Sequence, residues 1–104
     1  MEMMEKYIDF ITGRLSQGEL LAQLAEECTE LAKAALKLRR VYDGENPTPV
    51  SERQALDNLA EEIIDVHVCL AVTGLAKVDS EGDKRYEEKL KRWCSRLLGC
   101  YGEN

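Results

Sequence analysis

Two capping-box sequences most constrain what this chain can fold into. Ser16-Gln17-Gly18-Glu19 and Ser51-Glu52-Arg53-Gln54 each place a Glu or Gln three positions after a serine, a pattern in which the two side chains satisfy free backbone groups at a helix N-terminus. Each box opens a segment without proline in which apolar residues recur at helical spacing. The sequence therefore predicts one long helix from about Ser16 to Tyr42 and a second from about Ser51 to Thr73.

Two shorter amphipathic segments, residues 2–12 and 83–98, predict a short N-terminal helix and a third main helix. Residues 43–46, Asp-Gly-Glu-Asn, predict the end of the first long helix and a turn, and residues 74–82 predict a connection. No segment shows the period-two alternation of a half-buried strand. We therefore expect an all-α fold, a helical bundle of three main helices plus a short N-terminal helix.

The length of 104 residues allows one domain and not two. We expect residues 1–104 to form a single domain, with a core at about 16–98 and a frayed tail at 99–104. Three main helices give a thin core, and the helix over residues 51–73 is apolar on nearly every side. We therefore expect oligomerisation to complete the bundle, as a homodimer or homotetramer.

The net charge of −6 excludes classes of partner. An acidic chain does not attract nucleic-acid polymers or anionic membranes over long range, and it repels a polyanionic substrate unless a cation intervenes. No segment approaches the ~20 apolar residues of a membrane span, and the acidic N-terminus lacks an apolar signal core. Cys28 and Cys69 fall in apolar helical patterns, which favours buried thiols over a zinc site or disulfides. These features predict a reduced, cytoplasmic setting.

The candidate chemistry lies in acidic residues on the two long helices. On the first, Glu27 falls beside the apolar stripe, Glu30 lies about 60° further round, and Glu26 lies beyond it. On the second, Glu62, Asp65 and Cys69 share the one stripe that large apolar residues leave free. Glu26, Glu27 and Glu30 taken alone also fit an ordinary solvated helix surface.

A buried carboxylate without a partner is costly, so such acids need cationic side chains or a metal. The basic residues of the two helices lie mostly away from the acidic stripes. Acids spaced i, i+3 on two adjacent helices bring four carboxylates together, and an all-oxygen cluster suits Mg²⁺ or Mn²⁺. The only histidine, His67, lies on the apolar side of its helix, which favours a packed histidine or a subunit contact over a ligand.

The two acidic segments, LAEECTEL at residues 24–31 and LAEEIIDV at residues 59–66, resemble the MazG-like all-α nucleoside triphosphate pyrophosphohydrolases. The signature of that family is Glu-Glu-x-x-Glu on one helix and Glu-x-x-Asp on the next, and the similarity extends over roughly residues 16 to 98. The resemblance implies that Glu27, Glu30, Glu62 and Asp65 ligate Mg²⁺. It implies that Glu26 is a near neighbour that holds or activates water.

The resemblance also implies phosphate contacts from the last helix, where the family often has Lys, then Asn four positions later, then Arg three positions after that. Lys89 and Arg96 have this spacing, but Trp93 stands in place of the Asn. Trp93 either packs in the core or stacks on a base.

The reaction implied by the resemblance is Mg²⁺-dependent hydrolysis between the α- and β-phosphates of a nucleoside triphosphate, giving a nucleoside monophosphate and pyrophosphate. Two alternatives remain. One is a pyrophosphohydrolase acting on a modified nucleotide such as phosphoribosyl-ATP. The other is a non-catalytic helical interaction module whose acids are structural.

Overall fold

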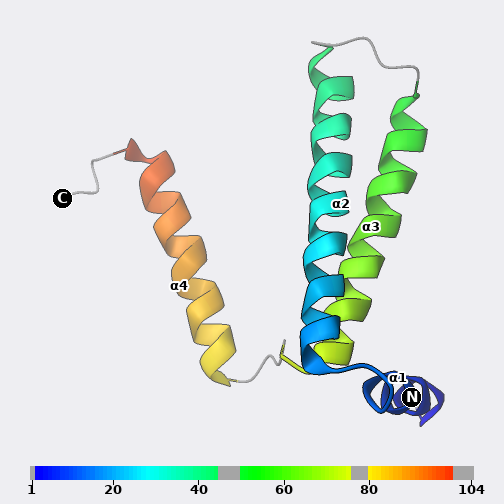
Figure 1. Ribbon diagram of the computed structural model, residues 1–104. Helices are drawn as coiled ribbons and strands as arrows, with labels where there is room; N and C mark the ends of the chain where they lie inside the picture. The colour runs from blue at the N-terminus through cyan, green and yellow to red at the C-terminus, as the bar shows by residue number, and fades with distance from the viewer. Residues whose placement is uncertain (1, 45–49, 76–79, 100–104) are drawn as a thin grey trace.

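The computed structural model describes residues 2–44, 50–75 and 80–99. Its elements are α1 (Glu2–Thr12), α2 (Gln17–Asp43), α3 (Glu52–Thr73) and α4 (Ser80–Leu97), as Figure 1 shows. The part of the chain so described contains no strand, which confirms the all-α class. The last helix begins at Ser80, three residues before the predicted start. Residues 80–82, predicted as part of the connection, are helical instead. Residues 45 and 46 of the predicted turn, residues 76–79 of the predicted connection and the tail from residue 100 lie outside the described residues.

Both predicted capping boxes are formed. The Ser16 hydroxyl accepts from the Glu19 N–H at 3.1 Å, and the Ser16 N–H donates to the Glu19 carboxylate at 2.8 Å. Ser51 and Gln54 repeat this exchange at 3.1 and 3.0 Å. Each exchange satisfies backbone groups that have no partner inside the helix, so the sequence fixes where both long helices begin.

α2 and α3 form an antiparallel hairpin, the main packed unit of the chain (Figure 1). The Gln17 side-chain amide donates to the Thr73 carbonyl at 3.4 Å, which ties the start of α2 to the end of α3. The facing positions of both helices recur at alternating spacings of four and three residues, as in coiled-coil seams. These seam positions are Leu20, Leu24, Glu27, Leu31, Ala34 and Leu38 on α2, and Ala55, Leu59, Glu62, Val66, Cys69 and Thr73 on α3.

The seam is the core of the chain, and it is thin. Leu20 and Leu38 are the buried residues of α2, whereas α3 buries Ala55, Val66, Cys69, Val72 and Thr73. Ala55 is only 1% exposed, so the two helices approach closely there. Among the described residues no large side chain is fully buried, as expected when only two helices pack along their lengths.

The remaining helices add little to this core. α1 lies across the end of the hairpin where α2 begins, and it contacts α3 (Figure 1). α4 stands apart from the hairpin and, within the described residues, has no packing partner comparable to these. The radius of gyration is 18.0 Å, against roughly 13 Å for a compact domain of this length. The helices found in the described part of the chain are too short or too polar to cross a membrane.

Candidate metal centre

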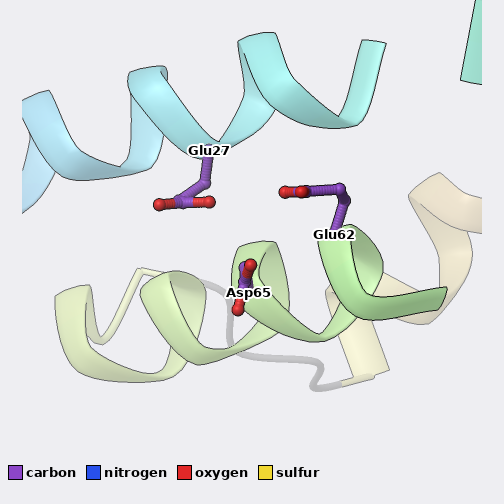
Figure 2. A group of neighbouring side chains, drawn as sticks. All are labelled: Glu27, Glu62 and Asp65. Carbon is purple, nitrogen blue, oxygen red and sulfur yellow. The ribbon is translucent and has the colours of Figure 1, made fainter. Parts of the chain in front are cut away.

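Three carboxylates meet between the two helices of the hairpin. Glu27 from α2 and Glu62 and Asp65 from α3 each offer one oxygen, and these oxygens lie within 4.8 Å of one another. Figure 2 shows Glu27 and Glu62 extending toward each other from facing helices, with Asp65 beside them. All three residues are half-buried. The structure thus brings together three of the four predicted ligands.

The seam explains why these acids converge. Glu27 follows Leu20 by seven residues and Glu62 follows Ala55 by seven, a spacing of about two helical turns that returns a side chain to the same face. Both acids therefore occupy positions that their helices otherwise give mostly to apolar residues. Asp65, three residues after Glu62, lies about one turn further along, next to the seam. The carboxylate cluster is built into the helix contact.

The surroundings of Glu62 disfavour its ionised form. Its Oε1 atom is buried and has no hydrogen-bond partner within the described part of the chain. Burial raises the pKa of Glu62, and the nearby carboxylates of Asp65, Glu27, Glu30 and Glu61 raise it further. Desolvation and like charges both disfavour the ionised form. An ionised Glu62 therefore calls for a positive partner.

The described side chains do not supply that partner. Their ion pairs join Lys33 to Glu30, Arg39 to Asp43, Arg53 to Asp57 and Lys91 to Glu87, at 3.2 to 3.8 Å. None of these pairs includes a member of the carboxylate cluster. The alternative that cationic side chains neutralise the cluster therefore has no support in the described residues.

Glu27 is oriented by a neighbour one turn earlier. The Gln23 side-chain amide donates to Glu27 Oε2 at 2.8 Å. Because a carboxylate oxygen accepts, this bond fixes which end of the Gln23 amide faces Glu27. The bond leaves the other Glu27 oxygen available to a ligand.

Two hollows flank the cluster. A polar hollow of about 240 Å³ is lined by Glu30, Lys33 and Lys37 from α2 and by Asn58, Glu61 and Glu62 from α3, with Ala34 and Ala55. A mainly apolar hollow of about 280 Å³ reaches Glu27 and Asp65. The cluster therefore stands between a surface that suits a charged group and a surface that suits an apolar one.

The cluster fits a hard divalent cation. Mg²⁺ and Mn²⁺ prefer oxygen ligands, and Mg²⁺ is commonly held by one or two carboxylates with water filling the remaining positions. The cluster offers three carboxylates, and one of them has a buried oxygen for which the described side chains provide no hydrogen-bond partner. A soft ion is less well matched, since no cysteine or histidine belongs to this group of ligand atoms.

The other two predicted acids lie at the edge of the centre. Glu30 is exposed and pairs with Lys33 at 3.6 Å, although its charge is close enough to raise the pKa of Glu62. Glu26 is exposed on α2 and lies outside the group of three. The ligand role of Glu30 and the water-activating role of Glu26 stay predictions.

The predicted substrate residues on the last helix gather at one place, away from the carboxylates. Lys89, Trp93 and Arg96 line a hollow of about 360 Å³ along α4. Figure 1 shows that α4 stands apart from the hairpin. Within a single chain these three residues therefore lie apart from the carboxylate cluster. Their contact with a substrate stays a prediction.

Three residues are more exposed than the sequence patterns indicate. Trp93 is 59% exposed, because no helix of the described part of the chain packs closely against α4, so it does not lie in the core of its own chain. Cys28 is exposed, because it lies on the outer side of α2, whereas Cys69 is buried as predicted. His67 is exposed on the outer side of α3, which excludes a packed histidine within the chain.

Sequence reasoning missed Gln23, whereas it placed Cys69 on the same stripe of α3 as Glu62 and Asp65. Gln23 precedes Glu27 by four residues, the spacing at which helix side chains meet, so a pairing signal was present. Cys69 lines the apolar hollow with Glu27 and Asp65. Burial raises the pKa of the Cys69 thiol, and the carboxylates of Glu27 and Asp65 raise it further, which keeps the thiol protonated.

Comparison of the chain with protein-family models, with curated proteins and with solved structures finds no match. The resemblance to the MazG-like enzymes therefore rests on the two acidic segments and on the order of the helices.

Proposed function

We propose that this chain is a Mg²⁺-dependent nucleoside triphosphate pyrophosphohydrolase that splits the bond between the α- and β-phosphates. The products are a nucleoside monophosphate and pyrophosphate. One observation carries the proposal: Glu27, Glu62 and Asp65 converge within 4.8 Å, and Glu62 Oε1 is buried with no hydrogen-bond partner among the described residues. The order and spacing of the acids, which resemble the MazG-like signature, support this reaction over other uses of a metal.

Glu27, Glu62 and Asp65 would hold the ion. Glu30, whose charge raises the pKa of Glu62, would be a fourth ligand. Mn²⁺ suits the same oxygens. When bound, the ion would supply Lewis-acid polarisation of phosphate oxygens and a water of lowered pKa. It would also screen the triphosphate from a protein of net charge −6.

The remaining roles fall to side chains around the cluster. Gln23 holds Glu27 in position through the 2.8 Å hydrogen bond. Glu26, which precedes Glu27 on α2 and is exposed, would accept the proton of the attacking water. Lys33 and Lys37 line the polar hollow together with Glu62 and stabilise charge on phosphate oxygens placed there.

A homo-oligomer in the cytoplasm belongs to the same proposal. Large apolar side chains are exposed on every helix, among them Tyr7, Ile64, Val68, Leu90 and Trp93. Contiguous exposed apolar surface marks an interaction site in soluble proteins. A second copy of the chain would cover part of it.

A pyrophosphate-release assay tests the proposal directly. The panel contains the ribo- and deoxynucleoside triphosphates and phosphoribosyl-ATP, each with Mg²⁺, with Mn²⁺ and with chelator. We expect metal-dependent release from at least one substrate. Turnover of phosphoribosyl-ATP alone would support the modified-nucleotide alternative, and no release from the whole panel would contradict the proposal.

Glu62→Gln probes the centre within the same assay. We expect loss of activity on the order of 100-fold or more, because the metal supplies several kcal/mol of charge stabilisation. Glu52→Gln is the matched control: it makes the same change on α3, at an exposed residue of the first turn. Equal activity of the two variants would show that the carboxylate cluster is not the active centre.

A further inference from the structure

α4 carries an apolar stripe that the described part of its own chain leaves uncovered. Tyr86, Leu90, Trp93 and Leu97 recur at spacings of four, three and four residues, which places them on one side of the helix. Each is at least 50% exposed. A charged helix with a single apolar side is stabilised by packing that side against another surface.

Cations border this stripe. Lys89, Arg92 and Arg96 line the same hollow along α4 as Tyr86 and Trp93. Over its whole length α4 has six basic and four acidic residues, whereas α2 and α3 together have five basic and ten acidic residues. The surface that covers the stripe should therefore be apolar and should lie beside acidic groups.

The hairpin and α1 present such a surface. An apolar groove of about 240 Å³ runs between α1 and α3, lined by Tyr7, Ile11, Val68 and Val72 among others. Ile11, Val68 and Val72 also line the adjoining hollow that reaches Glu27 and Asp65. The groove is thus apolar along its walls and acidic at one end, the complement of α4.

We propose that α4 of one copy docks in the groove between α1 and α3 of a second copy, with its cations facing the carboxylates of that copy. The second copy is the partner because α4 stands clear of this groove in its own chain (Figure 1). If two copies exchange α4 symmetrically, the contact forms twice. Two aromatic side chains bury roughly 300–500 Å² per helix, so two such contacts approach the ~800 Å² per partner of a stable interface.

This docking completes the carboxylate site across the interface. Lys89 and Arg96 lie apart from the carboxylates of their own chain and come to lie beside those of the partner. Only their contact with a triphosphate rests on the proposed pyrophosphohydrolase activity. The docking itself rests on the stripe, the groove and the charges.

Mass measurement of the full chain by size exclusion with light scattering tests the docking. We expect the mass of two chains or a multiple of it at micromolar concentration, and a monomer for Leu90→Asp. Leu36→Asp is the matched control, because Leu36 is 52% exposed and Leu90 50% exposed, but Leu36 lies on α2 away from the groove. Helical content by circular dichroism confirms that both variants stay folded. A monomeric parent chain, or equal masses of the two variants, overturns the proposal.

Zero-length carbodiimide cross-linking distinguishes exchange from docking within one chain. A mixture of unlabelled and ¹⁵N-labelled protein is cross-linked, and peptides joining Lys89 to Glu27 or Asp65 are analysed by mass spectrometry. Isotopically mixed pairs support the exchange, whereas pairs from single chains only, or no such pairs, contradict it. Both readouts are independent of turnover. An exchanged dimer without hydrolysis would therefore refute the proposed function alone, and a hydrolysing monomer would refute the docking alone.

Discussion

The α2/α3 hairpin and α4 use the same spacing of apolar residues with opposite outcomes. In the hairpin, positions alternating by four and three residues face each other and bury Leu20, Leu38 and Ala55. In α4, Leu90 and Trp93 follow the same spacing and remain half or more exposed. Helical periodicity predicts that a side of a helix will be covered, but it does not identify the surface that covers it.

The two regions also differ in where polar groups interrupt the pattern. In the hairpin, Glu27 and Glu62 stand inside the seam, where apolar residues would add more stability. Because the core of the chain is small, two carboxylates in place of apolar residues reduce its stability. The same position brings the two carboxylates within 4.8 Å of each other and of Asp65. On α4 the cations flank the stripe and leave it apolar. A carboxylate pair inside a helix contact is therefore the feature that most needs a functional explanation.

Truncating one leucine in each region gives the largest difference in stability. Leu38→Ala should lower the free energy of unfolding by about 2–5 kcal/mol, because it removes buried methyl groups and leaves a cavity. Leu90→Ala, measured in dilute protein where the chain is a monomer, should change it by less than ~0.5 kcal/mol, as exposed substitutions usually do. Urea denaturation measures both. Similar losses for the two variants would mean that α4 packs within its own chain.

The stability of the metal-free protein should depend on pH through Glu62 in the hairpin and not through an exposed glutamate on α4, and this effect is smaller than that of the leucine truncations. Because the pKa of Glu62 is raised in the folded state, folded Glu62 keeps its proton in a pH range where unfolded Glu62 has lost it. Its contribution to stability is therefore fully present below the ordinary glutamate pKa and is lost as pH rises through the raised value. Glu62→Gln should remove this loss and raise the unfolding midpoint at neutral pH above that of the parent chain.

Glu88→Gln, the same change at an exposed position of α4, serves as the control for this measurement. Thermal denaturation in chelator at several pH values compares the two variants with the parent chain. If Glu62→Gln unfolds at a lower temperature than the parent at neutral pH, the ionised Glu62 is stabilised by a partner within the protein, contrary to the electrostatics of the cluster.

Much of the fold could be predicted because its signals are local. The capping boxes at Ser16 and Ser51 fixed the start of both long helices to within one residue, and Gly44 and Gly74 end them in the left-handed conformation that glycine adopts readily. The placement of α4 could not be predicted, because periodicity shows only that its stripe needs a cover. The exposure of Trp93 on α4 and of His67 on α3 could not be predicted for the same reason, because periodicity does not show which sides of a helix other elements cover.

The candidate site could be predicted in part, for a related reason. Glu62 and Asp65 stand out because apolar residues surround them on α3, and helix geometry alone places Glu27 beside the apolar stripe of α2. Glu30 depends on side-chain conformation, and it turns to Lys33 at 3.6 Å. The hydrogen bond from Gln23 to Glu27 is likewise set by rotamers, so the sequence allowed it without requiring it.

The most direct test of the carboxylate cluster as a metal centre is the unfolding midpoint of the parent chain and of Glu62→Gln, each with Mg²⁺ and with chelator. A ligand that binds only the folded state stabilises it by about 2.7 kcal/mol at 100 times its Kd, which corresponds to a shift of roughly ten degrees or more in a domain of this size. We expect Mg²⁺ to raise the midpoint of the parent chain and to leave that of Glu62→Gln nearly unchanged. A parent chain that does not respond to Mg²⁺, or a variant that responds equally, would contradict the assignment.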